Sequence, residues 1–274
     1  MKVIFFNGNL GNQVFYCAFH AYLENKFPQQ KIYKYVTPYS PRVTVDKYFN
    51  LAMPQSNFFV NIVSFFVFVL DIFITKLSKK PIHNKIVCGR GRINENAIFY
   101  SNYLQDKKYY KGKDSNWLQV KMPDILSEKY LAFERMIKST NSISVHIRRG
   151  DYISKGTAYV DLSSTDYYEK AIAKSKELFP DCHLFFFSDD LEFVKSKFTG
   201  DNVHYVDCNR GANSYLDIKL MSLAKVNIMA NSSFSYWGAY MNNENKTIIY
   251  PKKWFREETK RDNPDIMLDN WIGM

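Results

Sequence analysis

The sequence lacks the short motifs that mark most metal, phosphate and hydrolase sites. Its five histidines form no HExxH or HxH pattern, and neither GxSxG nor GxxxxGK[ST] occurs in the 274 residues. These absences argue against a zinc protease, a serine hydrolase of the nucleophile-elbow type and a P-loop nucleotide site. Whatever chemistry the chain performs must therefore come from less common arrangements of residues.

Cysteine is also scarce and scattered. The four residues are Cys17, Cys88, Cys182 and Cys208, with no CxxC pair and no histidine at ligand spacing. We expect reduced thiols in a cytoplasmic protein, with no disulfide or metal framework. The start of the chain has only four apolar residues before Asn7, too few for a signal peptide, and predicts a first strand.

Long apolar runs are nearly absent, and the unusual segment is Phe58–Thr75. Its longest uninterrupted apolar stretch is Phe65–Leu70, and polar residues interrupt the rest. A membrane-spanning helix needs about 20 mostly apolar residues, so we do not expect this segment to span a membrane.

A basic run follows that apolar segment. No acidic residue occurs between Asp71 and Glu95, and the basic residues there are Lys76, Lys79, Lys80, Lys85, Arg90 and Arg92. An apolar helix followed by basic residues is typical of a protein lying on an anionic membrane face, so Phe58–Arg92 is a candidate for peripheral membrane contact. A buried core helix followed by a solvated basic loop explains the pattern equally well, and both interpretations stay open.

The overall composition is that of a globular, basic protein. Hydrophobic residues make up 46% of the chain, which excludes a disordered or fibrous protein, and the formal net charge is +10. This charge favours an anionic partner, such as a nucleic acid, a membrane surface or a phosphorylated small molecule. The aromatic residues fall mostly within apolar runs and no RNA-binding motif occurs, so we do not expect a nucleic acid.

Short apolar runs alternate with helix-like stretches, which predicts an α/β protein with parallel sheets. The expected strands are 3–6, 31–36, 142–147, 183–187, 203–206, 226–230 and 247–250. Helices are expected after residue 12, from about residue 164, over 191–198 and 215–224, and from residue 232. The alternation becomes regular after residue 140, where we place a domain boundary, giving domains 1–140 and 141–274.

The strongest chemical signal follows the strand 142–147. His146 and Arg148 lie two residues apart, so the alternation of a strand directs both side chains to one face. A guanidinium at the carboxyl end of such a strand is well suited to bind a pyrophosphate. Asp151 could orient the arginine or hold the turn, and Arg149 points the other way, toward an acidic partner. The alternative is a surface cluster of ion pairs.

A second polar group follows the strand 183–187. Asp189 and Asp190 come directly after Ser188, and a carboxylate there can accept hydrogen bonds from a guanine-type edge. The alternative is that one of these side chains only caps the next helix.

A third group lies between the strand 226–230 and the next helix. Ser232 and Ser233, followed by Phe234, present hydroxyl groups and free N–H groups suited to a phosphate. Simple helix capping explains one serine well and several less well.

A fourth group is the loop between the first strand and the first helix. Asn9, Gly11 and Asn12 combine amide side chains with a glycine that permits close approach to a ligand. It is not a GxGxxG fingerprint, and a tight strand-to-helix turn explains the loop about as well.

Together these segments resemble the bacterial α-1,2-fucosyltransferases of glycosyltransferase family 11. The resemblance rests on residues 8–19, 101–110, 144–152, 166–172, 185–190, 216–242 and 250–255. The HxRRGD part, His146–Asp151, is shared with α-1,6- and protein O-fucosyltransferases, so it marks the donor more than the linkage. Two features depart from the family pattern: Asn9 stands where glycine is usual, and Phe58–Arg92 matches no family segment, which makes it a candidate for acceptor choice.

The resemblance implies a GT-B architecture, with two Rossmann-like α/β domains facing each other across a cleft. We expect 1–140 to bind most of the acceptor and 141–274 to bind GDP-fucose. The implied reaction is an inverting, metal-independent transfer of L-fucose from GDP-fucose to the 2-OH of a galactose residue in a surface glycan, carried on an oligosaccharide or lipid-linked acceptor. The chain contains no Asp-x-Asp pair, the spacing that metal-dependent nucleotide-sugar transferases commonly use. The alternatives are another linkage or nucleotide sugar, or a non-catalytic protein that binds a nucleotide sugar or a nucleic acid.

The resemblance also implies roles for the residues singled out above. Arg148 would contact the donor's β-phosphate, and His146 with Asp189 or Asp190 would lie at the guanine side. The serines with Phe234 would line the diphosphate and sugar, and the loop Asn9–Asn12 would close over the reacting centre. Asp151 is the acid nearest to the motif, but a leaving phosphate oxygen could also take the acceptor proton, so we assign no general base. We expect a cytoplasmic protein, peripheral on the inner face of the membrane.

Overall fold

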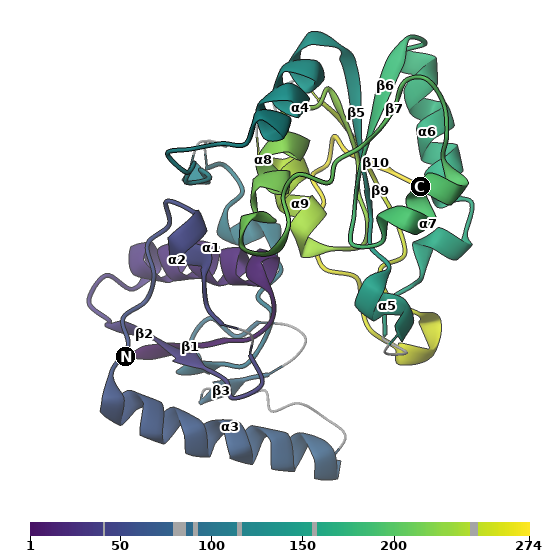
Figure 1. Ribbon diagram of the computed structural model, residues 1–274. Helices are drawn as coiled ribbons and strands as arrows, with labels where there is room; N and C mark the ends of the chain where they lie inside the picture. Colours follow the sequence, from purple (N-terminus) through teal and green to yellow (C-terminus); the bar gives the residue numbers. More distant parts are fainter. Residues whose placement is uncertain (41, 79–85, 90–92, 114–116, 155–157, 242–245) are drawn as a thin grey trace. The chain divides into compact units, whose positions relative to one another are not determined.

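The protein divides into two compact units in the computed structural model (Figure 1). The structure describes residues 1–274 except 41, 79–85, 90–92, 114–116, 155–157 and 242–245. Unit 1 comprises Met1–Lys113 with Pro264–Ile266, and unit 2 comprises Asp114–Asn263 with Met267–Met274. The division after Lys113 precedes the predicted boundary near residue 140, because helix α4 (Glu128–Ser139) packs on helix α8 (Leu216–Leu223) of unit 2.

Unit 1 is built on a parallel sheet with strand order β2-β1-β4-β3. Its strands are β1 (Lys2–Phe6), β2 (Ile32–Val36), β3 (Val87–Cys88) and β4 (Phe99–Tyr100), and its helices are α1 (Leu10–Lys26), α2 (Val45–Tyr48) and α3 (Phe58–Ser78). The predictions for β1, β2 and α1 are confirmed. The two short strands β3 and β4 were not predicted, because two residues are too few to show the alternation of apolar and polar side chains that marks a strand.

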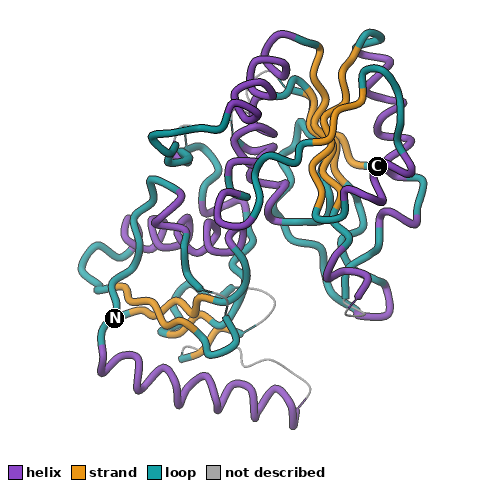
Figure 2. Tube along the Cα trace, viewed as in Figure 1, coloured by secondary structure: helices purple, strands orange, loops and turns teal. Residues whose placement is uncertain are grey.

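Strand β1 is the centre of unit 1 because both of its faces are covered. All five of its residues are buried. The ring of Phe6 packs 4.9 Å from that of Tyr16 in α1, whereas the ring of Phe5 lies 6.1 Å from that of Phe68 in α3. Helices α1 and α3 therefore cover opposite faces of this sheet (Figures 1 and 2). This arrangement leaves the carboxyl edge of the strands as the place where loops of unit 1 meet.

Helix α3 excludes one of the two interpretations left open for the apolar segment, the buried core helix. It is one continuous helix of 21 residues, long and apolar enough to cross a membrane by length and composition, although its apolar run is interrupted. It is also not a buried core helix, because only Ser64, Phe68 and Asp71 are buried. These three positions follow helical spacing and form the stripe that packs on the sheet, so the interrupting polar residues lie on the protected side.

Unit 2 contains a second parallel sheet, with strand order β10-β9-β8-β5-β6-β7. Its strands are β5 (Asn141–Ile147), β6 (Cys182–Ser188), β7 (Val203–Tyr205), β8 (Val226–Ile228), β9 (Thr247–Tyr250) and β10 (Ile272–Gly273). Its remaining helices are α5 (Gly150–Ser154), α6 (Tyr167–Leu178), α7 (Leu191–Lys197) and α9 (Ser233–Tyr240). All predicted strands and helices of this region are confirmed. The edge strand β10 was not predicted.

The chain order in unit 2 reverses between β5 and β8. From β5 the chain moves outward through β6 to β7, then returns to the other side of β5 and continues through β8 to β9 and β10. Helices α6 and α7 cover one face of the sheet, and α8 and α9 cover the other (Figure 1). Each unit is thus an α/β layer structure of the Rossmann type, as predicted. In such sheets ligands bind outside the carboxyl ends of the strands, where the strand order reverses.

Candidate active site

Three of the four predicted polar groups meet at the carboxyl edge of the unit 2 sheet. Register aligns Ile147 at the end of β5 with Ser188 at the end of β6, and β8 lies on the other side of β5. The loops that follow these strands carry Arg148, Asp189 and the N-terminus of α9. Parallel strands end at the same edge, which is why segments about 40 residues apart in sequence come together.

Arg148 and Asp189 form an ion pair at this edge. An Nη1–Oδ2 distance of 2.8 Å joins them, and each side chain keeps about a quarter of its surface exposed. The second carboxylate oxygen of Asp189 accepts a hydrogen bond of 3.0 Å from the backbone N–H of Arg149. A side chain at Gly150 would place its Cβ only 2.8 Å from Asp189 Oδ2, so this position favours glycine. Both oxygens of Asp189 thus hold the loop that carries Arg148.

Arg149 points away from Arg148 and fastens the loop to unit 2. Its Nε lies 3.0 Å from Asp190 Oδ2, its Nη1 donates to Ser163 Oγ, and its guanidinium lies 3.5 Å from the Phe193 ring centroid. The expectation that it pairs with an acid is confirmed. Asp190 also caps α7 by accepting a 3.1 Å hydrogen bond from the Phe193 N–H, and these partners hold the pKa of its carboxyl below the usual range. The capping alternative therefore describes Asp190.

His146 is buried beneath this edge as a neutral ring. It is 6% exposed, and its ring lies 5.7 Å from that of Phe234 at the start of α9. Burial and the nearby Arg148 charge lower the pKa of His146 to about 4. Within the described part of the chain, Nδ1 has no hydrogen-bond partner. A buried ring nitrogen without a partner at a ligand-binding edge can donate one hydrogen bond to a bound molecule or accept one from it, depending on the tautomer.

The serines at the start of α9 differ in whether their hydroxyl groups are already hydrogen-bonded within the protein. Ser232 is the N-cap residue, and its Oγ accepts a 3.3 Å hydrogen bond from the Phe234 N–H. Ser235 donates to the Ala230 carbonyl at 3.2 Å. Capping therefore explains Ser232, whereas Ser235 is buried and bonds to backbone carbonyls that precede the helix. Ser233, in the first turn of α9, stays partly exposed, and the N-terminal N–H groups of this helix face the loop region after β8.

Tyr152 belongs to this site, although the sequence analysis did not single it out. Its hydroxyl donates a 2.9 Å hydrogen bond to the Asn231 carbonyl, which joins the loops after β5 and β8. Its ring stacks on Tyr159 at 4.4 Å and lies 5.8 Å from the Arg148 guanidinium. The sequence did offer one signal that could have identified Tyr152, its position directly after the charged motif His146–Asp151. The side chain of Asp151 lies outside the described residues, so its role remains a prediction.

The fourth predicted group belongs to unit 1. Gly8 has a φ of +91°, the left-handed conformation that favours glycine, and Asn9 immediately precedes α1. Asn12 accepts a 2.9 Å hydrogen bond from Gln105 Nε2, which fixes its amide. Gly11, in the first turn, is buried. The predicted loop therefore ends at Asn9, because α1 begins at Leu10, and its closure over a reacting centre in unit 2 stays a prediction.

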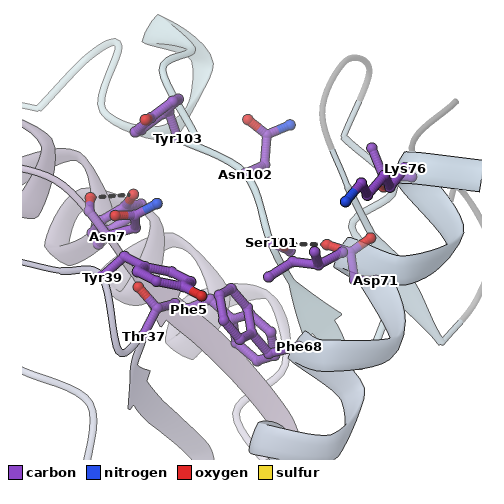
Figure 3. A pocket seen from close by; sticks show the side chains of 13 residues that line it. Phe5, Asn7, Thr37, Tyr39, Phe68, Asp71, Lys76, Ser101, Asn102 and Tyr103 are labelled. Atoms are coloured by element: carbon purple, nitrogen blue, oxygen red, sulfur yellow. Dashed lines mark hydrogen bonds between the residues drawn. The ribbon is translucent and has the colours of Figure 1, made fainter. Parts of the chain in front are cut away.

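Unit 1 has a pocket at the carboxyl edge of its own sheet, with a volume of about 450 Å³ (Figure 3). Three of its residues, Asn7, Thr37 and Ser101, follow the ends of β1, β2 and β4. Helix α3 supplies another wall through Asp71 and neighbouring residues. The sequence analysis did not predict this pocket, because its members come from five separated segments.

Comparison with known proteins identifies the family. The model of glycosyl transferase family 11 matches residues 89–274. The chain belongs to glycosyltransferase family 11. All unit 2 residues discussed above lie within this match, whereas α3 lies outside it. This family 11 chain is therefore a glycosyltransferase, whose reaction requires a nucleotide-sugar donor and a glycan acceptor.

Two curated relatives are from Escherichia coli. The O-antigen biosynthesis glycosyltransferase WbnK is 28% identical over 310 residues, covering 98% of each chain. An α-1,2-colitosyltransferase is 34% identical over 185 residues, covering 64% of this chain and 62% of the relative.

Solved structures show more distant likeness. The fucosyltransferase NodZ from Bradyrhizobium has a TM-score of 0.45 at 11% identity, covering 88% of this chain and 92% of NodZ. The E. coli ADP-heptose LPS heptosyltransferase II has a TM-score of 0.48 at 8% identity, covering 100% of this chain and 90% of that enzyme.

Proposed function

We propose that this family 11 enzyme transfers L-fucose from GDP-fucose, with inversion and without a metal, to the 2-OH of a galactose residue in a surface glycan. The observation that carries the proposal is the Arg148–Asp189 pair at the β5 edge, beside the N-terminus of α9. The α-1,2 linkage named for one relative and the O-antigen role named for the other support the linkage and the surface glycan. A donor other than GDP-fucose is the second candidate, because one relative is named as a colitosyltransferase.

The charge of the leaving group explains the central role of Arg148. Cleavage of the fucose–phosphate bond develops oxocarbenium character on the sugar and negative charge on GDP. A guanidinium held in place before reaction stabilises that charge without reorganisation, which is commonly the largest catalytic contribution. Asp189 aims this guanidinium, so we assign Asp189 as a positioning residue rather than a guanine contact.

The other residues of the edge complete the donor site. We assign the neutral ring of His146 to a hydrogen bond with the nucleotide, and the N-terminus of α9 with Ser233 and Phe234 to the diphosphate and sugar. Ser232 shapes that helix end through its cap. Asp190 supports the site indirectly, because it holds Arg149. Asp151 remains a candidate for taking the acceptor proton.

Transfer can be tested directly. We expect the purified protein to transfer radiolabelled fucose from GDP-fucose to galactose-terminated oligosaccharides in the presence of EDTA, and NMR of the product to show an α-1,2 linkage. UDP- and ADP-sugars should give no product. Turnover of another nucleotide sugar with none from GDP-fucose would assign the second candidate, and activity abolished by EDTA would contradict the metal-independent mechanism.

We also propose that unit 1 rests on the cytoplasmic face of an anionic membrane through the outer face of α3. Large apolar side chains project from this helix; those exposed are Phe58, Phe59, Ile62, Val63, Phe65, Phe66, Val69, Leu70, Ile72, Phe73 and Leu77. An apolar face of this size on one surface helix marks an interaction site. The basic sequence that begins at Lys76 and contains no acid before Glu95 complements anionic lipid.

Lying on the membrane fits α3 better than crossing it. Asp71 sits on its inner side and accepts a 2.7 Å hydrogen bond from Ser101 Oγ, and Phe68 packs in the sheet core. Crossing would detach this stripe and place the Asp71 carboxylate in hydrocarbon, at a cost of about 2.5–3.5 kcal/mol near the centre. A helix lying in the interface keeps these contacts and buries its outer face about 5–10 Å deep.

A further inference from the structure

We propose that the unit 1 pocket binds one neutral sugar residue of the acceptor glycan, with the Asp71 carboxylate accepting hydrogen bonds from its hydroxyl groups. This inference rests on the proposed function, which it deepens by locating the acceptor site in this chain. The pocket opens at the carboxyl edge of the β2-β1-β4-β3 sheet, the edge at which α/β sheets bind ligands.

Two buried polar groups in the pocket wall have unused hydrogen-bonding capacity. Asp71 is 8% exposed, and only its Oδ2 is bonded, to Ser101. Its Oδ1 and the Oγ1 of Thr37, a residue 3% exposed, have no partner within the described part of the chain. Buried polar atoms are nearly always paired in folded proteins. A ligand rich in hydroxyl groups provides the donors and acceptors that these two side chains lack.

The remaining walls suit the apolar side of a sugar ring. Phe5, Tyr39 and Phe68 gather along one side of the cavity, and Asn102 lies across from them (Figure 3). Tyr39 is mostly exposed, and its ring lies 6.2 Å from that of Phe68. Aromatic faces can pack against the C–H face of a sugar while the polar groups fix its hydroxyls. The volume of about 450 Å³ falls within the range typical of small-ligand pockets.

The charges that line the pocket favour a neutral ligand over the donor. They are one carboxylate, Asp71, and one ammonium, Lys76, so the pocket has no excess of positive charge to balance a diphosphate, which would also meet the Asp71 carboxylate. A neutral sugar meets no such penalty and gains charge-assisted hydrogen bonds. Asp71, Thr75 and Lys76 come from α3, outside the segment that matches the family, whereas Ser101 lies inside it. We therefore assign the α3 side of the pocket to acceptor choice.

The test combines direct binding with kinetics, using lactose as the probe. Asp71→Asn keeps the shape of the side chain and removes its charge, and Thr75→Trp fills the cavity from α3. We expect each to weaken lactose binding, followed by NMR without donor, and to raise the acceptor KM by about tenfold or more, the equivalent of about 1.4 kcal/mol. The donor KM and the slow hydrolysis of GDP-fucose without acceptor should stay unchanged. Asp46→Asn, an exposed acid of the same unit, should behave as wild type.

Each outcome separates the pocket from the proposed reaction. Unchanged lactose binding in folded Asp71→Asn protein would overturn the pocket assignment even if fucose transfer is confirmed. Pocket-dependent lactose binding without any transfer from GDP-fucose would retain the pocket and reject the donor. If Thr75→Trp alone disturbs folding, as seen by circular dichroism, Asp71→Asn decides the result.

Discussion

Two adjacent arginines perform different tasks at the donor edge. Arg148 keeps part of its guanidinium exposed and is held by Asp189, whereas Arg149 is fixed by Asp190, Ser163 and the Phe193 ring. Strand alternation carried past the end of β5 accounts for this division, because successive side chains point to opposite sides. The first arginine is thus available to a ligand, and the second anchors the loop that presents it.

Loss of the Arg148 side chain should nearly abolish turnover. We expect Arg148→Ala to lower kcat by about 10²–10³, the effect of losing one preorganised donor. Arg148→Lys should also be poor, because an ammonium lacks the planar fork of a guanidinium. Arg135→Ala, an exposed arginine on α4, is the matched control and should remain active. The measurement is steady-state transfer of labelled fucose, and a near-normal rate for folded Arg148→Ala would contradict the assignment.

His146 should make the stability of unit 2 depend on pH. Because burial and Arg148 lower its folded pKa from 6.5 to about 4, the unfolded state binds a proton first as the pH falls. The stability due to neutral His146 is therefore complete above pH 6.5 and is lost between pH 6.5 and 4. At pH 5 the loss is about 2 kcal/mol.

The variant His146→Gln, which has no titrating ring, should lack this part of the pH dependence. Urea unfolding at pH 7.5 and 5 can be followed by tryptophan fluorescence, since all four tryptophans, Trp117, Trp237, Trp254 and Trp271, belong to unit 2. Comparison with wild type cancels the other titrating groups. Equal pH dependence in both proteins would show that His146 is not buried as a neutral ring.

For single residues, the sequence predicted the side of the strand on which each side chain lies better than it predicted the residue that each side chain contacts. Strand alternation was enough to place His146 and Arg148 on one side and to send Arg149 toward an acid. It could not decide which aspartate held which arginine, because that depends on the register between β5 and β6. Tyr152 was missed for a similar reason: its partner, the Asn231 carbonyl, lies 79 residues away in the chain.

At the scale of elements, α3 shows how a polar residue in an apolar run can mislead. Ser64 and Asp71 interrupt the run in the sequence, which argued against a membrane-spanning helix. In the structure they lie on the sheet side with Phe68, and the exposed surface is the apolar one. Plotting the segment on a helical wheel would have shown that the polar residues share one face and the apolar residues cover the other. The pairing of Asp71 with Ser101, 30 residues away, is beyond any local pattern.

The outer face of α3 should bind anionic vesicles. We expect wild type to pellet with phosphatidylcholine vesicles that contain phosphatidylglycerol, and much less with phosphatidylcholine alone. Replacing Phe66 and Phe73 by glutamine should release the protein, and so should neutralising Lys76, Lys79 and Lys80. Ile125→Gln removes an even more exposed apolar side chain outside α3 and should bind as wild type.

Two results would contradict this surface. Wild type that never pellets with anionic vesicles would exclude the membrane. If light scattering instead shows a dimer that Phe66→Gln/Phe73→Gln converts to monomer, the face covers a second copy of the chain.

At the scale of the whole molecule, the α/β class and the existence of two Rossmann-like units follow from the alternation of strands and helices. The boundary was placed 27 residues too late, because α4 is polar and its two buried residues, Tyr130 and Ile137, gave little sign of packing in unit 2. The short strand β10 was missed because it lies beyond a long irregular segment, where only pairing with β9 defines it.

The route of the chain between the units has a consequence for synthesis. After most of unit 2, the chain returns to unit 1 for the three residues Pro264–Ile266. There the Lys107 N–H donates a 2.7 Å hydrogen bond to the Asp265 carbonyl, and Ile266 is fully buried. The chain then returns to unit 2 to add β10. On the ribosome, therefore, neither half can reach its final set of contacts until translation has passed residue 264. A nascent chain released early would carry a unit 2 sheet without β10 and the exposed apolar face of α3, and we expect chaperones to bind it.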